Sequence, residues 1–376
     1  MTTRKVLPLI ICVNILLGLA ACHADWEIEL TVDGAPARSI KAEEAAFYLD
    51  KSEQKTEAVL LDQFLFNQGF RLITDITVTC DDGQTLDYVW DNIAGEAALT
   101  MEGQFQIGND ACQPGSIELS PSEAMESIEL WITDLAPTIA QSLGLPELPD
   151  ADGTSQLDTT ADQAVLIVLD GTQYDRLMAE IAAGNMPYLA TMPEIHKGLT
   201  VYPSVTTTSS ASLLTGALPE KTKVYGHGFR STELTTLFDL AVENSLSVHA
   251  VEGSSLPFNL RNTEVTLSGD RDQNGYSDDN VFTNALKVIE TALPDLLYIH
   301  FHEIDDMGHS YGPYSNEYRN AMIRVDGYLE GIVKALPEGT LVVITADHGM
   351  HETDDGGNHG ALAANDMIIP IIFIEK

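Results

Sequence analysis

The chain has 376 residues, of which 57 are Asp or Glu and 19 are Lys or Arg, so its formal net charge is −38. Apolar residues make up 44% of the sequence, which is typical of a globular protein of about two domains and excludes a disordered or fibrous chain. The acidic balance also excludes a broad nucleic-acid-binding surface, because such a surface needs clustered cations. An anionic substrate would need a local positive centre, which a metal site would supply.

The first 21 residues are predicted to be an export signal. Arg4 and Lys5 precede an apolar stretch that is too short for a membrane-spanning helix. This stretch ends in Leu-Ala-Ala-Cys22, which resembles the lipobox of bacterial lipoproteins, so we expect Cys22 to carry a lipid. The lipid would be the only attachment of the exported protein to a bacterial membrane, on its periplasmic or exterior side. An ordinary cleaved secretory signal is the alternative.

Residues 22–145 are predicted to form a small accessory α+β domain. Short strand-like runs are separated by turn signals, and they lie at 26–32, 76–79 and 86–90. A helix is expected over 122–143, kinked or split at Pro137 and ending before Gly144. This region shows no catalytic cluster.

Cys80 and Cys112 remain in this domain once Cys12 and Cys22 are set aside. In an oxidising compartment a disulfide between them, closing a loop of about 30 residues, is favoured over two buried free thiols. Residues 146–162 carry Pro, Gly, Asp and Thr without periodicity, and we expect them to be a linker.

Residues 163–376 are predicted to form a doubly wound, mostly parallel α/β domain. Residues 164–169 are a continuous apolar run, as expected for a strand that is buried on both faces of a sheet. Similar runs recur at 247–251, 296–301, 341–345 and 368–374. Helical segments lie between them, at 173–184, 207–215, 232–244, 282–292 and 315–335. This alternation predicts right-handed crossovers and a ligand site beyond the carboxyl ends of the strands.

Acidic and imidazole side chains occur where the predicted strands end. They are Asp170, Asp305, Asp347, His309, His348 and His359. A single Asp before Gly is usually a turn residue, and a single His is usually a core or surface residue. Together, however, they form the carboxylate and imidazole set that suits Zn²⁺ and related divalent ions. The pattern therefore predicts a site for two metal ions.

Hydroxyl side chains follow Pro203 and open the helix predicted at 207–215. Negative charge is stabilised at a helix N-terminus, so a hydroxyl at this position is a candidate nucleophile. The alternative is that Ser204 or Thr206 only caps the helix. A Thr hydroxyl becomes a strong nucleophile when it is deprotonated, and coordination to a metal ion can achieve this.

In this order the motifs resemble those of the alkaline phosphatase superfamily, and most of all its type I phosphodiesterases and nucleotide pyrophosphatases. The similarity covers residues 164–376. It rests on Asp170-Gly171, Pro-Ser-Val-Thr206 with Thr-Gly216 after it, Asp305-Asp-Met-Gly-His309, Asp347-His348-Gly-Met and His359-Gly.

The resemblance implies an exported two-metal hydrolase that acts on a small phosphoester. One metal ion, expected to be zinc, would be held by Asp305, His309 and His359. The other would be held by Asp170, Asp347, His348 and Thr206. Thr206, which precedes Gly216 by ten residues as in the family, would attack phosphorus as a metal-bound alkoxide and form a phospho-threonine.

The sequence departs from the family pattern after Gly216. Thr222-Lys223 stands where His-Gly is usual, and His227 stands where an Asn contacts a phosphate oxygen. His227 and Arg230 are therefore the candidate substrate contacts.

A second motif, at 270–279, resembles a calcium-binding loop. Its candidate ligands are Asp270, Asp272, Asn274 and Asp278. Val281 replaces the bidentate Glu of an EF-hand, and Asp279 is a possible substitute ligand. A polar surface turn is the alternative interpretation.

A phosphodiesterase is favoured over a phosphomonoesterase, because the motifs contain no Arg to clamp a dianion. A sulfatase is disfavoured because no Cys lies in the nucleophile segment, and a mutase is disfavoured because the chain is too short for a large cap domain. The alternative from another class is a non-catalytic, metal-binding surface lipoprotein.

Overall fold

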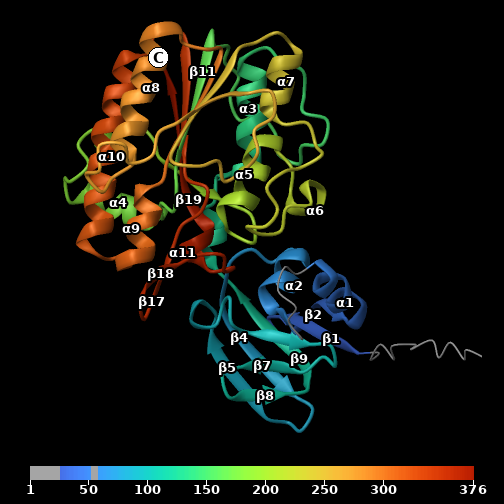
Figure 1. The fold of residues 1–376 in the computed structure, drawn as a ribbon. Coiled ribbons are helices and arrows are strands. Elements are labelled where there is room, and N and C mark those ends of the chain that lie inside the picture. Colours follow the sequence, from blue (N-terminus) through green and yellow to red (C-terminus); the bar gives the residue numbers. More distant parts are fainter. Residues whose placement is uncertain (1–25, 52–57) are drawn as a thin grey trace, which may run out of the picture.

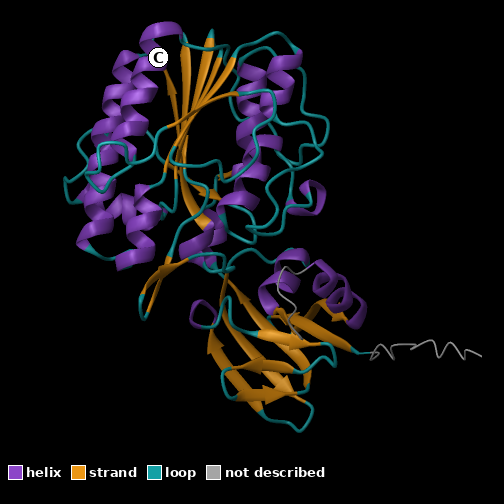
Figure 2. Ribbon diagram, viewed as in Figure 1, coloured by secondary structure: helices purple, strands orange, loops and turns teal. Residues whose placement is uncertain are grey.

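The computed structural model describes residues 26–51 and 58–376, which form a smaller and a larger region (Figures 1 and 2). The predicted export signal at 1–21 and Cys22 lie outside the described residues. Within the described ranges, every helix is too short or too polar to span a lipid bilayer.

Two sheets and two helices form the smaller region. The five-stranded sheet has the order β2-β1-β9-β4-β5, with β1 Glu27–Val32, β2 Ala35–Lys41, β4 Ile73–Cys80, β5 Thr85–Val89 and β9 Pro114–Pro121. The four-stranded sheet contains β3 Ala58–Leu60, β6 Ala98–Thr100, β7 Phe105–Ile107 and β8 Asp110–Cys112. The helices are α1 Ala42–Lys51 and α2 Leu61–Asn67. A disulfide between Cys80 on β4 and Cys112 on β8 links the two sheets.

The helix expected over 122–143 is only partly present. Glu123–Ser127 is a 3-10 turn, Leu130–Trp131 forms β10 at the edge of the larger sheet, and the α-helix α3 is restricted to Leu135–Ser142. Pro137 does not split α3, because it lies in the first turn, where its missing N–H removes no helical hydrogen bond. Gly144 follows the helix with a φ of +68°, as the sequence predicted for its end.

An eight-stranded sheet with the order β10-β12-β19-β16-β11-β15-β13-β14 forms the larger region. Its other bounds are β11 Gln163–Leu169, β12 His196–Leu199, β13 Val248–Glu252, β14 Glu264–Leu267, β15 Leu296–Phe301, β16 Thr340–Thr345 and β19 Ile368–Glu375. Neighbouring strands are parallel except where β19 pairs with β12 and β16. The apolar runs on β15 and β16 are buried along their whole length. These features confirm the doubly wound, mostly parallel fold.

Helices cover both faces of this sheet (Figure 1). One face carries α4 Tyr174–Ala182, α8 Asp278–Ala292, α9 Glu303–Tyr311 and α10 Asn316–Ala335. The other carries α3, α5 Thr206–Thr215, α6 Pro219–Thr222 and α7 Leu237–Glu243. A short hairpin and one helical turn precede β19, and they are β17 His351–Thr353, β18 Gly356–Asn358 and α11 Ala364–Met367. The helix α9 was not among the helical segments predicted from the sequence.

The two regions are joined by a buried polar contact that lies beside the loop before β19. The indole Nε1 of Trp90 donates to the carbonyl of Leu362 at 2.9 Å. The carboxyl group of Asp62, which is fully buried, accepts from the amides of Leu362 (2.8 Å) and Gly95 (3.0 Å). Residues of both regions also share one continuous hydrophobic core.

The pKa of Asp62 predicts how this contact responds to pH. Burial raises the pKa from 3.8 to about 6, so the folded protein binds a proton that the unfolded chain has released. The contribution of Asp62 to the free energy of unfolding is therefore complete below pH 3.8. About 2–3 kcal/mol of this contribution is lost as the pH rises through 6. We expect the difference in unfolding free energy between wild type and Asp62→Asn to fall by that amount from pH 4 to pH 7, as measured by urea denaturation. An equal difference at both pH values would contradict the assignment.

Candidate metal centre and active site

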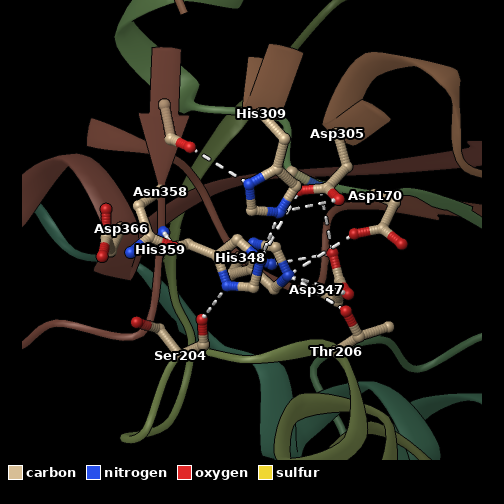
Figure 3. A network of polar contacts seen from close by, with 12 residues as sticks. Asp170, Ser204, Thr206, Asp305, His309, Asp347, His348, Asn358, His359 and Asp366 are labelled. Atoms are coloured by element: carbon tan, nitrogen blue, oxygen red, sulfur yellow. Dashed lines mark hydrogen bonds and ion pairs between the residues drawn. The ribbon is translucent and has the colours of Figure 1, made fainter. Parts of the chain in front are cut away.

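The polar side chains that the sequence singled out meet at one edge of the larger sheet. Asp170 follows β11, Asp347 and His348 follow β16, and Asp305 and His309 lie on α9, directly after β15. Thr206 is the first residue of α5, and His359 precedes β19. Figure 3 shows these side chains pointing toward one another from their separate elements. The carboxyl ends of parallel strands share one edge, which explains the convergence.

One group contains Asp170, Asp347, His348 and Thr206. The Nε2 atom of His348 lies 3.4 Å from Asp170 Oδ1, 3.5 Å from Asp347 Oδ2 and 3.3 Å from Thr206 Oγ1. Asp170, Asp347 and His348 are buried, whereas Thr206 is partly exposed. The donor atoms of Asp170, Asp347 and His348 lie close enough together to bind one ion.

A second group contains Asp305, His309 and His359. The Nε2 atoms of His309 and His359 lie 3.1 Å apart (Figure 3). Asp305 Oδ2 lies 3.3 Å from His309 Nε2, and Asp305 Oδ1 lies 3.7 Å from His359 Nε2. The rings of His348 and His359 stack with their centroids 3.7 Å apart, so the two groups are contiguous.

Backbone carbonyls orient all three imidazoles in the same way. The Nδ1 atoms of His348, His309 and His359 lie 2.9–3.0 Å from the carbonyl oxygens of Gly349, Gly357 and Ser204, respectively. A carbonyl oxygen can only accept, so each Nδ1 carries a proton, and each Nε2 points toward the carboxylates. This orientation is the one that imidazole ligands of a cation require.

The buried charges support the same interpretation. Asp170 Oδ1, Asp305 Oδ1 and Asp347 Oδ2 are buried and have no hydrogen-bond partner. Burial and the charge of Asp170 raise the pKa of Asp347 to about 7. Burial and the neighbouring His348 lower the pKa of His359 to about 2, so its ring is neutral. The carboxylates of Asp347 and Asp170 outweigh the effect of burial and raise the pKa of His348 to about 9. Because unpaired carboxylate oxygens attract cations and imidazole nitrogens bind divalent ions once they lose a proton, the residues present fit the expected metals.

The glycine after β11 makes this geometry possible. Gly171 has a φ of +67°, and its amide donates to Asp347 Oδ1 at 3.2 Å. A Cβ atom at this position would lie 2.7 Å from Asp305 Oδ1 and 3.0 Å from Asp305 Cα. Any other residue would therefore push α9 away from β11 and separate the two groups.

Three further residues of the site were not predicted from the sequence. His300, which lies on β15, and His302, which follows this strand, both contact Asp170. Glu252, at the end of β13, contacts both imidazoles. His300 was missed because it lies inside an apolar strand run, and Glu252 because it stands alone at a strand end. The alternation His300-Phe-His302 at the end of a buried strand was the available signal.

The candidate substrate contacts lie outside these two groups. His227 is exposed, and its ring centroid lies 6.1 Å from that of His359. Arg230 is also exposed, and its Nη1 approaches the carbonyl of Leu256 at 3.5 Å. No contact between Arg230 and the metal-binding groups is present in the described part of the chain.

The candidate calcium loop divides into two parts. Asp270 and Asp272 accept from the amide of Asn274, whose side chain contacts Asp272 and Asp279. The carboxylate of Asp278 is buried instead, where it accepts from the amides of His302 and Glu303 at the start of α9. The structure therefore gathers Asp279, and not Asp278, with the other three residues.

A family model matches most of the larger region. Residues 164–254 and 241–370, which together are more than half of the chain, match the family described as type I phosphodiesterase / nucleotide pyrophosphatase. Among solved structures, phosphonoacetate hydrolase from Sinorhizobium meliloti is 21% identical and covers 50% of this chain and 56% of its own, with a TM-score of 0.41. Murine ectonucleotide pyrophosphatase / phosphodiesterase 5 is 18% identical and covers 51% and 58%, with a TM-score of 0.42.

Curated relatives are transferases. GPI ethanolamine phosphate transferase 3 of Saccharomyces cerevisiae is 35% identical over 82 residues, which are 22% of this chain and 8% of the yeast protein. The human catalytic subunit of the same name is 29% identical over 85 residues, which are 23% and 8%. GPI ethanolamine phosphate transferase 2 of Schizosaccharomyces pombe is 25% identical over 243 residues, which are 54% and 30%. The matches thus span less than a third of the length of these relatives.

These relatives correct the predicted localisation. They are proteins of fungi and mammals, and this conflicts with a lipoprotein held on a bacterial membrane by Cys22. The prediction of a lipid-anchored protein facing the periplasm or the exterior is therefore wrong.

Gly171→Ala should destabilise the contact between β11 and α9. We expect a loss of at least about 2 kcal/mol in unfolding free energy, because alanine is strained at positive φ and its Cβ would collide with Asp305. Gly144→Ala is the matched control, since Gly144 has a φ of +68° and open space around its Cβ position. Chemical denaturation of both variants separates strain from collision. Equal destabilisation of the two would contradict a tight contact between β11 and α9.

Proposed function

The chain belongs to the type I phosphodiesterase / nucleotide pyrophosphatase family, and we propose that it cleaves small phosphodiesters with Thr206 as the nucleophile. Two divalent ions would assist, and zinc suits the donor set. Asp305, His309 and His359 would hold one ion, and Asp170, Asp347, His348 and Thr206 would hold the other.

One contact carries this proposal. Thr206 Oγ1 lies 3.3 Å from His348 Nε2, which faces the same space as the unpaired oxygens of Asp170 and Asp347. Of the three consecutive threonines, Thr207 instead donates its hydroxyl to the carbonyl of Gly226, and Thr208 is fully buried. Thr206 is thus the hydroxyl of this run that combines access to solvent with contact to the predicted ligands.

The surroundings of Thr206 favour an oxyanion. As the first residue of the ten-residue helix α5, it lies among amides that have no acceptor within the helix, and these stabilise negative charge. When bound, the divalent ions would supply the positive charge that lowers the pKa of the hydroxyl and neutralises the phosphate oxygens.

The reaction would proceed in two displacements. Thr206 Oγ attacks phosphorus and forms a phosphoryl–threonine bond, while the opposite phosphorus–oxygen bond breaks and the leaving oxygen takes up a proton. A water molecule then attacks the phosphorus of this intermediate, restoring the Thr206 hydroxyl and releasing the phosphorylated product. Positioning and charge stabilisation account for most of the catalysis in such transfers.

The charge around the site favours a monoanionic diester over a dianionic monoester. Among residues 26–51 and 58–376, no Lys or Arg nitrogen lies within 4 Å of the carboxylates of Asp170, Asp305 or Asp347. A monoester usually requires an Arg clamp for its additional charge. The positive charge that binds the substrate would therefore come from the metal ions alone.

A second candidate function is transfer to an alcohol in place of water. The curated relatives are named ethanolamine phosphate transferases, and the first displacement on Thr206 would be the same. The acceptor alone distinguishes the two functions. Hydrolysis is favoured here because His309 is 40% exposed, so water reaches the site directly.

Thr206→Val should lower the hydrolysis of bis-p-nitrophenyl phosphate by about 10³-fold or more, because it removes the nucleophile and keeps the side-chain shape. Thr206→Ser should retain measurable activity. Thr208→Val is the matched control, since the Thr208 hydroxyl is buried without a partner, and it should remain as active as wild type. Mass spectrometry of acid-quenched wild type should detect a phosphoryl group on Thr206. Wild-type turnover by Thr206→Val would exclude this nucleophile.

The acceptor can be identified with the same substrate. We expect p-nitrophenyl phosphate, the product of attack by water, to predominate over the alkyl p-nitrophenyl phosphate when ethanolamine or glycerol is added at millimolar concentration. Liquid chromatography with mass detection measures both products. Predominance of the alkyl diester would assign the transferase function instead.

A further inference from the structure

The one-turn helix α11 carries two adjacent polar residues, Asn365 and Asp366, that the proposed reaction does not use. Asp366 is fully buried and Asn365 is partly buried, and neither belongs to a group of potential metal ligands among the described residues. Figure 3 shows Asp366 beyond His359, on the side away from Asp170. A buried carboxylate is unfavourable unless hydrogen bonds stabilise it, so its contacts indicate its role.

The side chain of Asp366 is connected to the ring of His359 by a continuous series of hydrogen bonds. Asp366 Oδ2 accepts from the amide of Ala361 at 2.9 Å. The carbonyl oxygen of Ala361 accepts from the hydroxyl of Ser204 at 2.9 Å. The carbonyl oxygen of Ser204 in turn lies 3.0 Å from His359 Nδ1. Asp366 therefore helps to fix both the backbone after His359 and the direction of its ring.

His351 balances the charge of this carboxylate. His351 Nδ1 lies 2.8 Å from Asp366 Oδ1 and 3.0 Å from Asp366 Oδ2. Among residues 26–51 and 58–376, no Lys or Arg nitrogen lies within 4 Å of Asp366. Burial opposes a charge on His351, but its hydrogen bond to Asp366 and the charge of Asp366 outweigh burial and raise the pKa of the imidazole. The pair connects α11 to β17, which begins three residues after His348.

The backbone of α11 also contacts the segment that carries His348. The amide of Gly349 donates to the carbonyl oxygen of Asp366 at 2.8 Å, and the carbonyl oxygen of Gly349 lies 2.9 Å from His348 Nδ1. A Cβ atom at Gly349 would collide with the carbonyl oxygen of Asn365. A glycine at this position thus allows α11 to pack directly against the segment after β16.

Asn365 connects α11 to the turn that carries Asp170. Its Oδ1 accepts from Gln173 Nε2 at 2.5 Å. Gln173 follows Asp170 by three residues, and its amide donates to the hydroxyl of Tyr318 at 3.2 Å. This hydroxyl donates to the carbonyl oxygen of Gly171 at 2.7 Å. The turn after β11 is therefore held by both Tyr318 and Asn365.

We propose that Asn365 and Asp366 are positioning residues that set the distance between the two ion-binding groups. Asp366 positions His359, and so supports the ion held by the second group. Asn365 positions the turn of Asp170, and so supports the ion held by the first group. The inference rests on the two-ion site of the proposed function, but it does not depend on Thr206 as the nucleophile.

Zinc affinity tests this assignment one ion at a time. Purified protein is stripped with a chelator and titrated with Zn²⁺ in competition with a chromophoric chelator. Asp366→Ala should weaken the binding of one ion by about 10- to 100-fold, as for other residues that orient a metal ligand. This effect should disappear in a His359→Ala background and persist in an Asp347→Ala background.

Asn365→Ala should show the opposite pattern. We expect it to weaken the binding of one ion by about 2- to 10-fold, since a single hydrogen bond is lost. This effect should disappear in the Asp347→Ala background and persist in the His359→Ala background. The same competition assay measures all of these variants.

Asp326→Ala is the matched control for loss of a buried carboxylate. Asp326 is 2% exposed and accepts from the amides of Tyr188 (2.9 Å) and Leu189 (2.8 Å), outside every ligand group. This variant should lower the free energy of unfolding and leave zinc affinity unchanged. Asp366→Asn should bind zinc more tightly than Asp366→Ala, because its side chain can still accept from Ala361 and donate to a neutral His351.

The proposal fails if Asp366→Ala and Asn365→Ala bind zinc as tightly as wild type. It also fails if Asp326→Ala weakens zinc binding equally, because the effect would then reflect general destabilisation. If Asp366→Ala does not fold, Ser204→Ala breaks the same connection by removing one hydroxyl, and unchanged zinc affinity in that variant would overturn the proposal. Absence of phosphodiester hydrolysis in a wild type that shows these affinity changes would refute the proposed function and leave this inference intact.

Discussion

The convergence of imidazole nitrogens on buried carboxylate oxygens is the constraint on which the site depends. Backbone carbonyls accept from Nδ1 of His309, His348 and His359, so each Nε2 points toward the carboxylates. The Nε2 atoms of His309 and His359 lie 3.1 Å apart, and either a shared proton or a cation would stabilise this pair. The rigid sheet below supports the arrangement.

The parallel sheet makes this concentration of ligands possible. Strands β11, β15 and β16 are adjacent, and each ends in a turn that places ligands at the same level. A glycine with positive φ after β11 allows α9 to approach until Asp305 contacts the turn. The apolar strands below are fully buried, so the turns cannot move apart without disturbing the core. The packing of the buried strands in the core thus determines the position of each candidate ligand.

Much of this arrangement could be predicted from the sequence, because buried parallel strands are continuous apolar runs and their ends are conspicuous. The candidate ligands Asp170, Asp347 and His348 follow such runs. Local patterns failed where tertiary contacts decide the structure. The stretch 122–143 has a helical pattern, yet Leu130–Trp131 pairs with β12, and the α-helix begins only at Leu135. His300 has an apolar neighbour on either side, and only the position of Glu252 on the adjacent strand shows its role.

The contact between Asp62 and Leu362 connects the smaller region to the segment that carries His359. An interaction that fixes the position of this segment also fixes His359, because His359 precedes Leu362 by only three residues. Ion binding at the proposed site and association of the two regions would therefore be thermodynamically linked, and each would strengthen the other by the same free energy. A protein that occupies the outer surface of the smaller region and strains this contact would then weaken ion affinity from a distance. The accessory region would in this sense contribute to cation binding.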